Sequence, residues 1–122
     1  MESPYKGKTG LNRIWNAFFY SIDGLNAAFR HEDAFRQEVL LALILIPIAL
    51  HMPVSGIGKA LMVASVLWVL IVELLNSGIE AVTDRISLED HALAKRAKDL
   101  GSAAVMLSLV SVPVVWLLTI FG

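Results

Sequence analysis

Cysteine is absent from the 122 residues, which excludes disulfides, iron–sulfur clusters and cysteine-ligated zinc. Charge is also scarce, since Asp, Glu, Lys and Arg make up 17% of the chain against about 25% in an average soluble domain. Ten basic residues are offset by eleven acidic ones, so no basic field exists to hold a nucleic acid by counterion release. The chain also lacks the glycine-rich phosphate loop, the dinucleotide fingerprint, the zinc-protease motif and the nucleophile elbow. These absences argue against thiol chemistry, nucleic-acid partners and the nucleotide loops of soluble enzymes.

Apolar residues are abundant instead. They make up 57% of the chain, and the mean hydropathy of +0.68 points to lipid as the solvent. A bilayer span needs about 20 predominantly apolar residues, and three segments qualify: 33–52, 56–83 and 98–121. We therefore expect an all-α integral-membrane protein in which residues 1–122 form one domain with three transmembrane helices.

The segment before the first span has a different pattern. Its apolar residues recur at helical spacing on one face, and polar residues occupy the other. This predicts an amphipathic helix over residues 10–28 that lies in the headgroup plane. A signal peptide is a weaker alternative, because the stretch has no continuous apolar run and no small-residue cleavage site follows. The apolar face consists of Leu11, Ile14, Trp15, Phe18, Phe19, Ile22 and Leu25.

Basic residues are distributed unequally between the two sides of the expected membrane. Only Lys59 lies on the side of the loop between the first two spans, whereas the other nine lie on the opposite side. The positive-inside rule therefore predicts a cytoplasmic amino terminus, and three spans then place the carboxyl terminus outside. The nine are Lys6, Lys8, Arg13, Arg30, Arg36, Arg85, Lys95, Arg96 and Lys98.

A row of polar residues interrupts the second span. Glu73, Asn76 and Glu80 stand at i, i+3 and i+7, which places them on one helix face near the expected cytoplasmic end, and Asp84 extends the row. Ionisable groups at membrane depth are costly unless they are paired or hydrated, so the row is a candidate functional site. The alternative is a polar seam that only joins helices. A seam of this kind would explain the asparagine. It explains the two glutamates less well, because they have no basic partner in the span.

A hard cation would offset this negative charge, since Mg²⁺ binds carboxylate oxygens and completes its shell with water and substrate phosphates. Glu32, Glu38 and Asp99 are further acidic candidates at a similar depth. Lys98 opens the third span at the level of Glu80, where a lysine can bind phosphate as a point charge. Simple snorkelling to the interface explains the spacing of Lys98 equally well.

Four stretches together resemble the small integral-membrane diacylglycerol kinases of bacteria. They are residues 10–14 (GLxRI), 32–38 (ExAFRQE), 72–85 (VELLNSxIEAVxDR) and 97–105 (AKDxGSAAV), and the resemblance extends over nearly the whole chain. It implies a homotrimer of three-span protomers with a surface helix, and the phosphorylation of diacylglycerol by ATP with Mg²⁺. It also implies a location in the bacterial inner membrane.

The resemblance further implies roles for individual residues. Glu73 would be the catalytic base, and Glu32 and Glu80 would hold the nucleotide-bound Mg²⁺. Contacts with ATP would come from Arg13, Tyr20, Asn76, Lys98 and Asp99, with Glu89 and His91 near the nucleotide. The lipid site would include Arg13, Ala34, Phe35, Arg36, Gln37, Glu38 and Ser102.

Three alternatives remain open at this point. Undecaprenol kinases share the same motifs, so the motifs do not separate the two lipid substrates. A small oligomeric ion channel could line a pore with Glu73 and Glu80, and a non-catalytic membrane assembly protein is a third possibility. A kinase needs Lys98 and Asp99 clustered with the glutamates, whereas a channel does not. Because three thin spans cannot shield the polar row, we also expect a neighbouring protomer to close a composite active site.

Overall fold

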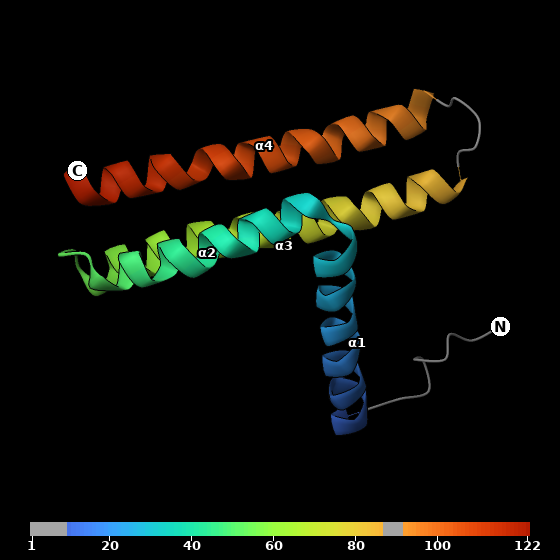
Figure 1. The fold of residues 1–122 in the computed structure, drawn as a ribbon, viewed down its shortest axis with the longest axis horizontal. Coiled ribbons are helices and arrows are strands. Elements are labelled where there is room, and N and C mark those ends of the chain that lie inside the picture. Colours follow the sequence, from blue (N-terminus) through green and yellow to red (C-terminus); the bar gives the residue numbers. More distant parts are fainter. Residues whose placement is uncertain (1–9, 87–91) are drawn as a thin grey trace.

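The computed structural model describes residues 10–86 and 92–122, and these form four helices (Figure 1). They are α1 (Gly10–His31), α2 (Asp33–His51), α3 (Gly56–Ile86) and α4 (Ala92–Phe121). α2, α3 and α4 run side by side, and each is long and apolar enough to cross a membrane. α1 leaves this bundle crosswise where α2 begins. The expected all-α architecture with three membrane-spanning helices is confirmed.

The helices differ slightly from the segments expected from hydropathy. α1 runs through Gly24 to His31, and α4 begins at Ala92, ahead of the uncharged part of the span. Within this charged first part of α4, Lys95 Nζ donates to Asp99 Oδ2 at 2.7 Å across one helical turn, a pair that adds a little stability to the helix. Hydropathy identifies only the part of a helix that lies in lipid. The helix itself can extend beyond that part into polar sequence.

The corner between α1 and α2 is built around a single extended residue. Glu32 has φ −117° and ψ 108°, so the helical backbone is interrupted there. Arg36 Nη1 donates to the carbonyl oxygens of Phe29 at 2.8 Å and Arg30 at 2.9 Å, and its guanidinium also pairs with Asp33. The last carbonyl groups of a helix lack intrahelical donors and carry partial negative charge. Arg36 therefore caps α1 from the first turn of α2 and fixes the change of direction.

α3 is the central helix and packs against α4 more extensively than against α2. At the end of the bundle away from α1, the Trp116 indole N–H of α4 lies 3.2 Å from the Met62 carbonyl oxygen and 3.1 Å from Ser65 Oγ. A Cβ on Gly58 would stand 2.8 Å from Thr119 Cγ2, so the two helices meet there without room for another atom. This half of the α3–α4 pair is held by close packing.

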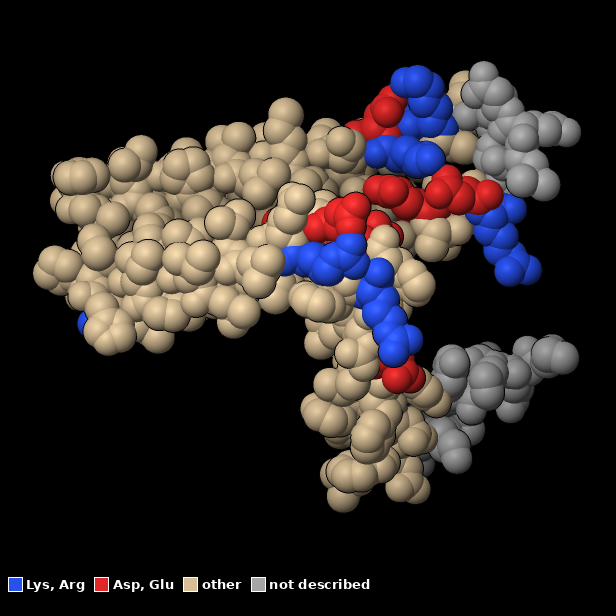
Figure 2. Space-filling model, in the orientation of Figure 1, with Lys and Arg blue, Asp and Glu red and all other residues tan. Residues whose placement is uncertain are grey.

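Much of the remaining surface is apolar and exposed. Only 6% of the most hydrophobic window of α4 is buried, and on α1 only Ala28 is. The charged residues gather at one end, where α1 joins the bundle, α3 ends and α4 begins (Figure 2). Lys59, in the first turns of α3, lies at the other end. A single protomer thus presents lipid-compatible surface along its length and a polar surface at one end.

Candidate functional site

The polar row of α3 runs from the interior of the bundle to its charged end. Glu73 and Asn76 are 6% and 8% exposed, Glu80 is half-buried and Asp84 is exposed. Helical spacing puts all four on one face, as the sequence predicted. The row therefore connects the buried interior at membrane depth with the end of the bundle that can meet water.

Hydrogen bonding within the row is incomplete among the described residues. Asn76 Nδ2 donates to Glu80 Oε1 at 3.0 Å. Asn76 Oδ1 and Glu73 Oε2 are buried and receive no hydrogen bond from the part of the chain that the structure describes. Buried polar atoms are nearly always paired, so unpaired acceptors call for a partner from outside the protomer, such as a ligand or water.

Other carboxyl groups surround Glu73. Glu38 of α2 lies directly beside it, and the charges of Glu80 and Glu32 also act on it. Glu38 in turn borders an apolar pocket of about 170 Å³ between α2, α3 and α4, and its Oε2 is also buried without a partner among the described residues. Glu73 thus lies within electrostatic range of three other acidic side chains, from the α1–α2 corner, α2 and α3 itself.

The lysines at the start of α4 are engaged with acidic residues nearer the end of the bundle. Lys98 Nζ lies 2.8 Å from Asp84 Oδ1, which ties α4 to the last residue of the row, and Lys95 pairs with Asp99. Lys98 is also within electrostatic range of Glu80. Of the glutamates in the row, Glu80 is within electrostatic range of Lys98, whose direct partner is Asp84, whereas Asp99 is engaged on α4 itself.

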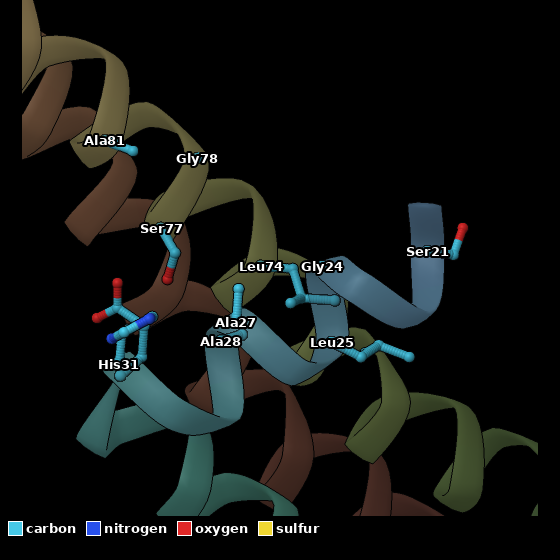
Figure 3. A pocket seen from close by; sticks show the side chains of 11 residues that line it. Ser21, Gly24, Leu25, Ala27, Ala28, His31, Leu74, Ser77, Gly78 and Ala81 are labelled. Atoms are coloured by element: carbon cyan, nitrogen blue, oxygen red, sulfur yellow. The ribbon is translucent and has the colours of Figure 1, made fainter. Parts of the chain in front are cut away.

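A groove of about 730 Å³ lies between α1 and α3, with Glu32 at its border (Figure 3). His31 and Ser77 stand at one end of it, and Ser21 and Leu25 at the other. Small side chains from both helices keep it open. The sequence analysis missed this groove, although small residues at helical spacing on both segments could have indicated it: Gly24, Ala27 and Ala28 on α1, and Ser77, Gly78 and Ala81 on α3.

The remaining predicted site residues lie at varied places. Arg13 and Tyr20 are exposed on α1, and Ser102 is exposed on α4. In the segment expected to line the lipid site, Phe35 is only 3% exposed and packs in the interior, whereas Arg36 holds the helix corner. Ala34 and Gln37 are exposed. Glu89 and His91 lie outside the described residues.

The donor set suits a magnesium ion that is bound together with a phosphate ligand. No three His, Asp or Glu side chains form a complete metal cage within residues 10–86 and 92–122. Mg²⁺ does not require one, because it is usually held by one or two carboxylates plus substrate phosphates and water. Glu32 and Glu80 both lie within electrostatic range of Glu73, and carboxylate oxygens are the ligand type that Mg²⁺ prefers.

Comparison with known proteins identifies related sequences. Residues 19–120 match the family described as prokaryotic diacylglycerol kinase. A diacylglycerol kinase of Pseudomonas aeruginosa is 56% identical over 120 residues, which cover 98% of this chain and 98% of that protein. Diacylglycerol kinases of Haemophilus influenzae and Escherichia coli are 49% and 46% identical, over 88% and 93% of this chain and 92% and 93% of theirs.

Proposed function

This chain belongs to the prokaryotic diacylglycerol kinase family, and from that premise we propose that it transfers the γ-phosphoryl group of ATP to diacylglycerol. The products are phosphatidic acid and ADP. The observation that carries the proposal is the position of Glu73. It is buried at membrane depth with an unpaired carboxylate oxygen, in a row that leads to the charged end of the bundle.

This placement suits the two substrates. Diacylglycerol presents its primary hydroxyl at the level of the headgroups, and ATP approaches from water. The level at which α1 leaves the bundle is where both can meet. The groove between α1 and α3, bordered by Glu32, offers space for substrate next to the row.

Phosphoryl transfer depends mainly on positioning and on electrostatic stabilisation. The lipid hydroxyl oxygen attacks the γ-phosphorus while the bond to the β-phosphate bridging oxygen breaks, and Glu73 accepts or orients the hydroxyl proton. Asn76 holds Glu80 through its amide. Glu80 and Glu32 are the residues that would hold the nucleotide-bound Mg²⁺, and the ion would supply positive charge against the phosphates. Lys98 adds positive charge at the same level.

The nucleotide and lipid contacts form the outer part of the proposed site. We assign nucleotide contacts to Arg13, Tyr20, Asn76, Lys98, Asp99, Glu89 and His91, and lipid contacts to Arg13, Ser102 and the segment 34–38. Binding of a phosphate by Lys98 would exchange its present ion pair with Asp84 for a pair with the nucleotide. Arg36 can contribute to the lipid contacts while it still holds the helix corner.

A homotrimer with composite sites is part of the proposal. The most hydrophobic window of α4 is only 6% buried, and the unpaired acceptors of Glu73 and Asn76 lack a partner among the described residues of their own protomer. Glu73 and Asn76 are already buried within one protomer, so the expectation that three spans leave them open to lipid is wrong for these two. A neighbouring chain would instead shield the half-buried Glu80 and cover the exposed apolar surface of α4. We place the protein in the bacterial inner membrane with its charged end on the cytoplasmic side. ATP is available there, and the positive-inside rule expects the basic residues there.

The test is ATP consumption by the purified protein in mixed micelles, with diacylglycerol and undecaprenol offered separately. We expect Mg²⁺-dependent turnover with diacylglycerol, and phosphatidic acid as the product. Turnover with undecaprenol alone would move the assignment to a polyprenol kinase, and no turnover with either lipid would overturn the kinase proposal.

A further inference from the structure

Gly101 is one of only two buried residues among the described residues of α4, together with Ser108. It faces the polar row of α3. A Cβ built on Gly101 would overlap Asn76 Oδ1, and it would lie 3.2 Å from Asn76 Cγ and 3.8 Å from Ile79 Cδ1. The Asn76 amide thus occupies the space where a side chain at position 101 would begin.

The space left by Gly101 accommodates the oxygen end of the Asn76 amide. Its oxygen is turned to Gly101, and its Nδ2 is turned to Glu80 Oε1 at 3.0 Å. Any side chain at position 101 must push the amide out of this orientation or move α4 away from α3. Either change breaks or lengthens the hydrogen bond that holds the Glu80 carboxylate.

We propose that Gly101 is a positioning residue for Glu80: the space it leaves at the α3–α4 contact sets the Asn76 amide in the orientation that holds the Glu80 carboxylate. The inference rests on the proposed function, in which Glu80 binds the metal of the nucleotide. It adds that one residue of α4, without touching metal or substrate, determines the geometry of a ligand on α3.

The chain contains a matched control at the other end of the same helix pair. Gly58 is also in close contact across the α3–α4 interface, where its Cβ would lie 2.8 Å from Thr119 Cγ2. Gly58→Ala and Gly101→Ala therefore both crowd the interface, but only the second touches the row. A merely structural role for Gly101 predicts the same behaviour for the two variants.

The first measurement is the Mg²⁺ concentration that gives half-maximal ATP consumption in the assembled protein. We expect Gly101→Ala to raise it about tenfold, the lower end of the effect seen when a residue that orients a metal ligand is lost. Gly58→Ala should leave it unchanged while lowering the unfolding temperature. Equal Mg²⁺ requirements in wild type and Gly101→Ala would overturn the inference.

The second measurement does not depend on activity. In protein labelled with ¹⁵N-asparagine, the side-chain amide signal of Asn76 should shift in Gly101→Ala and stay in place in Gly58→Ala. An unmoved signal in Gly101→Ala contradicts the proposed contact. If wild type fails to phosphorylate diacylglycerol, the proposed function falls, but this measurement still decides whether Gly101 orients Asn76.

A double-mutant cycle covers the case in which Gly101→Ala does not assemble. Asn76→Ala removes the amide that the new Cβ would strike, so the double variant Asn76→Ala with Gly101→Ala should fold and unfold at the temperature of Asn76→Ala alone. If Gly101→Ala prevents assembly of the Asn76→Ala background as well, or destabilises it as much as wild type, the two residues are not coupled and the inference is wrong.

Discussion

Replacing Arg36 with glutamine tests the corner between α1 and α2. The substitution removes the cation whose Nη1 donates to the Phe29 and Arg30 carbonyl oxygens at 2.8 and 2.9 Å. Nη1 carries two N–H groups, one for each carbonyl oxygen, and because both bonds come from a single partly exposed nitrogen we take about 1.5–3 kcal/mol for the two together. The Arg36 side chain is 36% exposed, which favours the lower end of that range, and its ion pair with the highly exposed Asp33 adds at most about 0.5 kcal/mol.

We therefore expect Arg36→Gln to lower the free energy of unfolding by about 2 kcal/mol. The assay is reversible unfolding in mixed detergent micelles, followed by circular dichroism. Arg36→Lys keeps the charge but lacks the guanidinium fork that reaches the two carbonyl groups with Nη1 and Asp33 with Nη2, so its loss should fall between those of the glutamine variant and wild type.

Arg30→Gln is the matched control for charge. Arg30 also lies in the last turn of α1, and none of the described residues pairs with its side chain. Its loss should cost only the interaction with the helix dipole, about 0.3–1 kcal/mol. Equal losses for Arg36→Gln and Arg30→Gln would refute the reasoning, because the two carbonyl contacts would then contribute nothing measurable.

The remaining predictions concern the proposed reaction and the arrangement of the chain. Glu73→Gln should nearly abolish phosphoryl transfer with ATP affinity and assembly retained, because a base acts mainly in the transition state; turnover within about tenfold of wild type would remove it from that role. Glu80→Gln and Glu32→Gln should each raise the Mg²⁺ requirement, and metal titrations that overlay the wild-type curve would disprove the metal assignment. Cysteines introduced by Ser55→Cys and Asp90→Cys should react with an impermeant reagent on intact cells only in the first variant; labelling of the second would reverse the topology. Glu32 already lies within electrostatic range of Glu73 in the same protomer, so mixed assemblies of Glu73→Gln chains and Glu32→Gln chains should regain activity only if the working pair forms between chains; no recovery would place this pair within one chain.

Periodicity and hydropathy were sufficient for the elements of the fold and for the row on α3. Three apolar segments identify the spans because lipid imposes a minimum length, and the spacing of Glu73, Asn76 and Glu80 places them on one face of any helix. These features are local to one helix. They hold whatever the neighbouring helices do.

The contacts between helices could not be predicted in the same way. The Lys98 pair with Asp84, the Arg36 cap on α1 and the contact of Gly101 with Asn76 all depend on where two helices cross. The small residues at 101–104 predict only that another helix can come close. The point at which the helices cross then decides which side chain fills the space. Arg36 illustrates the limit, since the motif implies a lipid contact but gives no sign of the carbonyl groups that it caps.

The two halves of the α3–α4 pair carry different kinds of contact. Away from the charged end, Gly58 packs on Thr119 and Trp116 bonds to the α3 backbone, so the helices are held by shape and by contacts that need no partner. Toward the charged end, the described contacts are polar or involve a glycine, and the acceptors of the row are left open. Substitutions that crowd the packed end should therefore lower stability with little effect on metal dependence, whereas crowding at Gly101 should alter both.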